Sequence, residues 1–425
     1  MRRTLYTIII CAAQLMAACS GDDGTPSVTP TPIPGGDQPV VFSVGMADDT
    51  LSTRVGFSND ISNVAGLDSK GGFGVFGCYT GLHKYVDSNV TPDFMYNEHV
   101  VWQAASPQSA EGTWTYAPIK YWPNGEGIVT GNTGKNEHYV SFMAYAPYSD
   151  NNENNPETNP AGYCIPSFSL QGELGNPWLT YRLHSDVEHQ VDLLYARHTD
   201  LTPILDLTKP AINEKVHFNF DHALACVGDK VNIICSTGLQ NQTNSRVVGS
   251  ATNAKVEVTG FTIKYTLTSK ARLVLWNHGE ANWQTIWSEE PLCTRTITFV
   301  DPEDNSDDVA IYAKETTIPE TFTLQGTWEN KGVFYIPKEL TGYAQTAEVH
   351  ITYRIATYSG GNWIYDADNI GTATLHLHDF AEAYKPGKHL YINVTLNQMD
   401  IALTAAIAPW QTVEGFPKDV EGIED

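Results

Sequence analysis

The feature that most limits the fold of this chain is an alternation of apolar and polar residues with a period of two. Successive side chains of a β-strand point to opposite faces of a sheet, so this period is typical of strands that bury one face. The alternating runs are rich in Thr, Tyr and Val, Gly, Pro and Asn separate them, and helical periodicity is scarce. They cover residues 41–46, 74–79, 138–145, 191–196, 216–220, 255–258, 261–267, 346–353 and 389–396. The sequence therefore predicts an all-β protein with antiparallel sheets.

The length of the chain indicates more than one core. The chain has 425 residues, 41% of them hydrophobic, whereas single cores stop growing near about 250–300 residues. Prolines in the segment 201–210 suggest a hinge. We expect two tandem β-sandwich domains at residues 40–210 and 211–415, followed by an acidic tail at 416–425.

The N-terminus has the composition of an export signal. Arg2 and Arg3 precede an apolar stretch, and Ala17 and Ala18 stand directly before Cys19. This pattern predicts a lipoprotein signal peptide at 1–18, with Cys19 as the palmitate-bearing first residue of the mature chain. An ordinary secretory signal cut near the same place is the alternative. Residues 19–39 are rich in Pro, Gly, Thr and Asp, so we expect a flexible tether that anchors the protein to a membrane.

The charge of the chain excludes one class of partner. Asp and Glu number 49 against 25 Lys and Arg, a formal net charge of −24, and loss of two arginines with the signal takes it to about −26. A surface of this sign repels phosphate, so we expect no binding of nucleic acid.

Five cysteines remain after Cys11 leaves with the signal and Cys19 is lipidated. No two of them have C-x-x-C spacing, which argues against zinc. We expect most to be buried thiols, with a bridge between Cys226 and Cys235 as the alternative. The five are Cys78, Cys164, Cys226, Cys235 and Cys293.

Catalytic motifs are missing from the sequence. It holds neither a Gly-x-Ser-x-Gly elbow nor a His-Glu-x-x-His helix, so we predict no catalytic residue, metal or cofactor, and a non-enzymatic protein. His222 is expected to be a turn residue with a satisfied ring nitrogen. His376 and His378 could hold a metal together, but we favour a solvated strand face. A surface hydrolase remains a rival if two carboxylates face each other in a cleft.

Five sequence blocks stand out along the chain, at residues 112–123, 139–148, 192–196, 216–225 and 384–391. The first contains Trp114, Tyr116, Tyr121 and Trp122, whose expected role is core and corner packing. Together the blocks resemble those of the fimbrillin family, the lipoprotein-derived subunits and accessory proteins of type V pili.

The resemblance implies two transthyretin-like β-sandwich domains and an outer-membrane lipoprotein at the cell surface or in a fimbrium. It also implies adhesion to a host or bacterial surface ligand that the sequence does not identify. In that family a trypsin-like protease cuts after a basic residue behind the first strand. The vacated groove then accepts a strand from another pilin subunit, a form of β-augmentation.

The residues for this mechanism are present. The candidate displaced strand contains Val41, Phe42, Val44 and Met46, of which the last three share one face. Arg54 is the candidate cleavage site, with Lys70 as the alternative.

The C-terminal residues help to distinguish a stalk subunit from an accessory, tip or anchor subunit of a pilus. Residues 401–410 could form a last strand or a donor segment, but residues 411–425 are acidic and broken by glycine and proline. Because a stalk subunit needs a long detachable strand there, we expect an accessory, tip or anchor subunit.

The rival binding hypothesis is a surface lipoprotein that recognises glycans. Exposed tryptophans can stack on sugar rings, although we expect at least two of the three candidates to pack inward. The candidates are Trp276, Trp283 and Trp287.

Overall fold

A computed structural model gives the fold of most of the chain. It describes residues 38–46, 61, 64–106, 112–123, 138–150, 163–197, 204–208, 210, 214–235, 254–277, 280–286, 291–300, 309–312, 322–323, 332–396 and 401–409. Strands dominate these residues, and the all-β prediction is confirmed. The helical elements in the described residues are α1 (Val64–Ser69), η1 (Val187–His189), η4 (Leu377–Asp379) and η5 (Ala381–Tyr384). Within the described ranges, no helix is long and apolar enough to cross a membrane.

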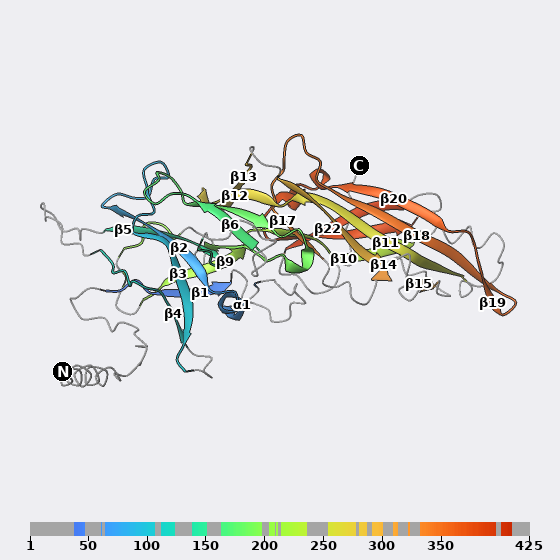
Figure 1. Ribbon diagram of the computed structural model, residues 1–425, viewed down its shortest axis with the longest axis horizontal. Helices are drawn as coiled ribbons and strands as arrows, with labels where there is room; N and C mark the ends of the chain where they lie inside the picture. Colours follow the sequence, from blue (N-terminus) through green and yellow to red (C-terminus); the bar gives the residue numbers. More distant parts are fainter. Residues whose placement is uncertain are drawn as a thin grey trace, which may run out of the picture.

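The N-terminal unit is a sheet that closes on itself (Figure 1). Its strands follow the order β1-β4-β3-β2-β5-β8-β9. Its core is rich in aromatic rings, among them Phe42, Phe73, Phe142 and Phe218. The strands are β1 (Phe42–Met46), β2 (Phe73–Gly81), β3 (Met95–Ala104), β4 (Gly112–Thr115), β5 (Tyr139–Ala146), β8 (Leu194–Arg197) and β9 (Val216–His222).

The C-terminal unit is a sandwich of two sheets with an apolar core between them. One sheet has the order β16-β10-β21-β22, with β17 also paired to β10. Its strands are β10 (Ala225–Cys235), β16 (Phe322–Thr323), β17 (Val333–Tyr335), β21 (Lys388–Leu396) and β22 (Ile401–Pro409). The other has the order β14-β11-β18-β19, with β15 paired to β11 and β20 to β18. Its strands are β11 (Ala254–Thr268), β14 (Leu292–Val300), β15 (Val309–Tyr312), β18 (Thr346–Ser359), β19 (Asn362–Tyr365) and β20 (Asn369–His376).

A third sheet, of order β13-β12-β7-β6, lies between the two units (Figure 1). It combines strands from both predicted domains, because β12 pairs with β7 from Lys270 opposite Arg182 to Val274 opposite Trp178. A separate core of residues from the barrel, this sheet and the sandwich packs against it. The strands are β6 (Tyr163–Phe168), β7 (Trp178–Leu183), β12 (Lys270–Asn277) and β13 (Glu280–Gln284).

The strand pairing does not follow the expected boundary between residues 210 and 211. β9 lies beyond that boundary, yet it pairs with β1 and β8 and completes the barrel. The chain passes from β9 to β10 through Ala223 and Leu224, both fully buried. Prolines mark a connection within the barrel, whereas the passage between the units is short and apolar.

Among the strands that the structure describes, two pairs depart from the antiparallel prediction. β1 pairs in parallel with β9, and β10 in parallel with β21. Parallel partners need long crossover connections, and these pairs join segments far apart in the sequence. A period of two shows which residues of a strand share a face, but it does not show which other strand pairs with it or in which direction.

The cysteines include buried thiols, as expected. Burial, reinforced by the nearby Asp93, raises the pKa of Cys78 to about 12. Cys226 is also buried. Cys226 and Cys235 stand nine residues apart on β10, a separation of about 30 Å along an extended strand. The bridge kept as an alternative is therefore wrong.

Residues 184–190, here called the junction segment, lead from β7 of the middle sheet toward β8 of the barrel and contact the sandwich on the way. The Arg295 side chain donates from Nε to the Ser185 carbonyl at 2.9 Å and from Nη2 to the His184 carbonyl at 2.8 Å. Gln190 accepts a hydrogen bond from the Phe334 backbone N–H at 2.9 Å. Val187 packs against the sandwich core. These contacts fix the two units against each other.

We expect the substitution Arg295→Ala to destabilise the protein by about 3 kcal/mol, because it removes two charge-assisted hydrogen bonds at a buried site. Chemical denaturation measures this loss. As a control, Lys264→Ala breaks an ion pair with Glu348 whose side chains are 44% and 34% exposed, so it should cost less than about 1 kcal/mol. Equal losses in the two variants would contradict the role given to Arg295.

Candidate functional site

The candidate site is built around β1, which is paired very differently along its two edges. On one side it runs parallel to β9 over its whole length, from Phe42 opposite Val216 to Met46 opposite Phe220. On the other side its register with β4 contains one pair, Phe42 opposite Trp114. Figure 1 shows β1 beside β9 at this end of the molecule. β1 therefore closes the barrel chiefly through β9.

The inner face of β1 fills an aromatic pocket, as the alternation predicted. Phe42 is 1% exposed and Met46 5% exposed, and Val44 packs against the same core. The Phe42 ring stacks on Phe218 with centroids 5.1 Å apart. Its further ring contacts are Tyr116 at 5.4 Å, Phe142 at 5.9 Å and Phe73 at 6.4 Å. Removal of β1 would leave a hydrophobic slot lined by these rings.

The outer face of β1 is polar and small. Ser43 Oγ forms a hydrogen bond of 2.9 Å with His217 Nδ1. A Cβ atom placed on Gly45 would lie 3.2 Å from His217 Nε2 and 3.4 Å from Asn219 Oδ1. His217 and Asn219 of β9 thus limit the size of the side chains that this face of β1 can carry.

The aromatic block at residues 112–123 forms the corner that holds the start of β1. The Tyr116 hydroxyl donates to the Val40 carbonyl at 2.9 Å. The Val40 N–H donates to the Lys120 carbonyl at 2.9 Å, and the Trp122 N–H to the Gln38 carbonyl at 2.8 Å. Burial raises the pKa of Tyr116 well above its usual value, so the phenol stays protonated and able to donate.

Other residues of this block behave largely as expected. Trp114 and Trp122 are buried in the barrel core, whereas Tyr121 is 46% exposed. Sequence reasoning assigned the block to core and corner packing, but it did not identify Val40 as the residue that the corner holds.

The candidate lipidation and cleavage residues, Cys19 and Arg54, lie outside the described residues. Lys70 is described: it directly follows α1, and its N–H donates to the Gly66 carbonyl at 3.1 Å. Ile61 and Leu67, which lie between the two basic residues in the sequence, are fully buried in the barrel core. A cut after Lys70 would remove both side chains together with β1, whereas a cut after Arg54 would leave them in place.

Trp276, Trp283 and Trp287 are the residues of the alternative glycan platform, and the two that the structure describes pack against the central core, as expected. Trp283 is 3% exposed, and its Nε1–H donates to the Ala223 carbonyl at 2.7 Å. Trp276 packs partly against the same central core, and Trp287 lies outside the described residues. Because β13 pairs with β12 and the Trp283 ring is buried, Trp283 cannot stack on a sugar from solvent.

His222 is held in a buried pair. Its Nδ1 lies 2.6 Å from Asp192 Oδ2, and the two side chains are 3% and 0% exposed. This ring nitrogen is thus satisfied, as expected, and a substrate has no access to it. His222 is, however, the last residue of β9 and not the turn residue that the sequence predicted. The pair joins two of the sequence blocks, 192–196 and 216–225.

His376 and His378 do not share one strand face. His376 ends β20 and His378 lies in η4, with ring centroids 5.3 Å apart. The part of the chain that the structure describes contains no group of three or more His, Cys, Asp or Glu residues placed to hold a metal ion.

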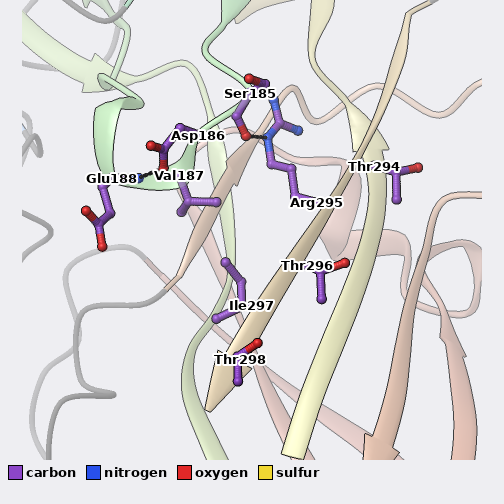
Figure 2. A pocket seen from close by; sticks show the side chains of 9 residues that line it. All are labelled: Ser185, Asp186, Val187, Glu188, Thr294, Arg295, Thr296, Ile297 and Thr298. Atoms are coloured by element: carbon purple, nitrogen blue, oxygen red, sulfur yellow. Dashed lines mark hydrogen bonds between the residues drawn. The ribbon is translucent and has the colours of Figure 1, made fainter. Parts of the chain in front are cut away.

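A pocket of about 490 Å³ lies between the junction segment and β14. Figure 2 shows Arg295 directed toward Ser185 and the Glu188 carboxylate pointing away from Arg295. Burial opposes ionisation of Asp186, but hydrogen bonds from the Glu188 N–H and from His189 lower its pKa below the usual value. The pocket does not present two facing carboxylates, as a glycosidase would need. It is lined by Ser185, Asp186, Val187, Glu188, Thr294, Arg295, Thr296, Ile297 and Thr298.

Comparison with known proteins supports the fimbrillin-like resemblance. No family model matches the chain. The chain is 26% identical over 224 residues to the fimbrium subunit Fim1C of Phocaeicola vulgatus. The match covers 52% of this chain and 49% of that protein, so the chain spans about half the length of this curated relative.

A solved structure has the same fold. The crystal structure of a fimbrial protein from Bacteroides vulgatus ATCC 8482 aligns with a TM-score of 0.55 at 18% identity. The alignment covers 88% of this chain and 100% of the other. The chain is fimbrillin-like, and its fold is shared with a fimbrial protein.

We expect Trp283→Ala to destabilise the protein by about 3–5 kcal/mol, as removal of a large buried ring does. Ile370→Ala, at a side chain that is 79% exposed, should change the stability by less than about 0.5 kcal/mol. Denaturation with tryptophan fluorescence measures both. Full stability of Trp283→Ala combined with loss of a sugar-dependent signal would reinstate the platform.

We expect Tyr116→Phe to loosen the start of β1. The variant keeps the ring but leaves the Val40 carbonyl without this donor, at a cost of about 1–2 kcal/mol. The measurements are the free energy of unfolding and the rate of limited trypsin cleavage between β1 and β2. Tyr121→Phe, at an exposed ring in the same block, is the matched control. A cleavage rate unchanged from wild type in Tyr116→Phe would argue against the anchoring role.

Proposed function

We propose that this chain is a non-enzymatic, fimbrillin-like pilus subunit that assembles at the cell surface by strand exchange and takes part in adhesion. The observation that carries the proposal is the asymmetric pairing of β1. This strand plugs an aromatic pocket and lies along β9, while one residue pair links it to β4. Such a strand can leave without dismantling the sheet on its other side.

The physical driving force is the cost of an empty groove. Loss of β1 strips the ladder partners from one edge of β9 and opens the pocket of Phe42. Unpaired backbone groups and exposed aromatic walls are both costly in water. An incoming strand restores the hydrogen bonds and the apolar contacts together, which is the basis of β-augmentation.

Arg54 is the proposed site of the cut that opens this groove. Arg54 and Lys70 are the basic residues between β1 and β2. A cut after Lys70 would remove the buried Ile61 and Leu67 from the barrel core, so it would damage the acceptor. Proteases also favour exposed loops, whereas the Lys70 backbone is held by the turn that ends α1.

The order of these features along the chain couples anchoring to assembly. In the proposal, the acylated Cys19 holds the uncut chain at the outer membrane through the tether. Because Cys19 and β1 lie on the same side of Arg54, one cut releases the lipid anchor and empties the groove. Membrane attachment and readiness to accept a strand then exclude each other, and the partners of the cut form are other pilin subunits.

The proposed position is accessory, tip or anchor, because residues 411–425 are acidic and interrupted by Gly and Pro. The nine-residue β22 nevertheless gives the chain a strand long enough to be donated. An anchor subunit would remain uncut, so the terminus of the assembled protein separates these positions.

N-terminal sequencing of surface-extracted, assembled protein tests the cleavage step. We expect wild-type material to begin at Val55. Arg54→Ala should keep the acylated Cys19 and remain unassembled, and Lys70→Ala should behave as wild type. Assembled wild-type protein that retains Cys19 throughout would refute cleavage-gated exchange.

A further inference from the structure

The structure assigns a selectivity to the groove: His217 and Asn219 on β9 restrict which strand can replace β1, and β22 of a second copy of this chain meets the restriction. The inference rests on the proposed function, since it concerns the same groove. It goes further by naming the side chains that choose the partner and the register in which the partner binds.

The outer face of the groove imposes two conditions on neighbouring positions. At the position of Ser43, a hydroxyl group satisfies His217 Nδ1, as Ser43 Oγ does at 2.9 Å. At the position of Gly45, a Cβ atom would lie 3.2 Å from His217 Nε2 and 3.5 Å from His217 Cε1, with Asn219 Oδ1 at 3.4 Å. A methyl group requires a shift of a few tenths of an ångström in the imidazole. A branched side chain would have to displace both His217 and Asn219.

The inner face adds a third condition. The positions of Phe42, Val44 and Met46 all face the barrel core, so a replacement strand needs apolar residues there. Five consecutive residues must therefore be apolar, hydroxyl-bearing, apolar, small and apolar. A generic hydrophobic strand meets the inner condition and fails the outer ones.

Residues 403–407 of β22 have this pattern. Their sequence is Leu-Thr-Ala-Ala-Ile, against Phe-Ser-Val-Gly-Met in β1. Thr404 then takes the place of Ser43, and Ala406 takes the place of Gly45. Thr404 is the sole hydroxyl residue between positions 401 and 409, so the hydroxyl condition fixes one parallel register.

The position of β22 in its own sheet suits a donor. β22 is the last strand of the order β16-β10-β21-β22, and in that order its neighbour is β21. Ile407 of β22 packs against the sandwich core. In the groove Ile407 would take the place of Met46, which also faces an apolar core.

The comparison also accounts for the order of events. Leu403 and Ala405 have fewer apolar carbons than Phe42 and Val44, so β22 fills the pocket less completely than β1. The covalently tethered β1 therefore excludes β22 in an uncut chain. After the cut, β1 is no longer covalently tethered to the barrel, so it competes with β22 for the groove as a separate segment.

Peptide binding to the full mature chain, cut after Arg54 by a trypsin-class protease, tests the inference. The probe is a fluorescent peptide of residues 400–410, and the readout is fluorescence anisotropy. We expect the parent peptide to bind the cut chain and not the uncut chain. Thr404→Val in the peptide should weaken binding by about three- to tenfold, the effect of one lost hydrogen bond. Ala406→Val should weaken it at least tenfold, because it overpacks the site.

A matched substitution on the other face is the control. Ala405→Val adds the same atoms one residue away, where Val44 stands in β1, and should bind as well as the parent or better. His217→Ala in the protein should restore binding of the Ala406→Val peptide, which a general loss of strand propensity would not explain.

The outcomes separate the inference from the proposed function. If the Thr404→Val and Ala406→Val peptides bind like the parent, the selectivity is refuted and strand exchange stands. If the cut protein polymerises but does not bind the parent peptide, β22 is not the donor and the inference again fails alone. If the cut protein neither polymerises nor binds any peptide, the proposed function itself is refuted.

Discussion

The barrel depends on β9, because the two edges and the two faces of that strand each make a different set of contacts. One edge pairs with β1 and the other with β8. Phe218 and Phe220 enter the barrel core, while His217 and Asn219 face the outer side of β1. The period of two that marks β9 in the sequence therefore divides it into a face that packs in the core and a face that contacts the outer side of β1.

The sequence predicted the faces of strands better than their partners. It indicated that Phe42, Val44 and Met46 share a buried face, because alternation is a local property of a strand. It did not indicate that β1 runs parallel to a strand about 170 positions later, because pairing over such a distance depends on the packing of the whole barrel. The strand pairing does not follow the expected boundary at residues 210 and 211 for the same reason. Prolines indicate local turns, whereas β9 pairs with β1 and β8 on the other side of that boundary.

The candidate site was predicted in part for similar reasons. The aromatic block and the satisfied ring of His222 were expected from their residue types, and the structure supplies their partners, Val40 and Asp192. Trp283 was offered as a binding surface because tryptophans cluster near it in the sequence. Its hydrogen bond to Ala223 shows why clustering alone is insufficient: the middle sheet places this ring at the junction between the units.

The buried passage from β9 to β10 has a mechanical consequence. A strand seated in the groove would lie parallel to β9, and β9 continues through Ala223 and Leu224 into the sandwich without a flexible spacer. In the proposed filament, a pull along the axis would load this ladder of hydrogen bonds in shear, so that many bonds must break at once rather than one by one. Tension from flowing liquid would be carried from one subunit to the next along the backbone itself.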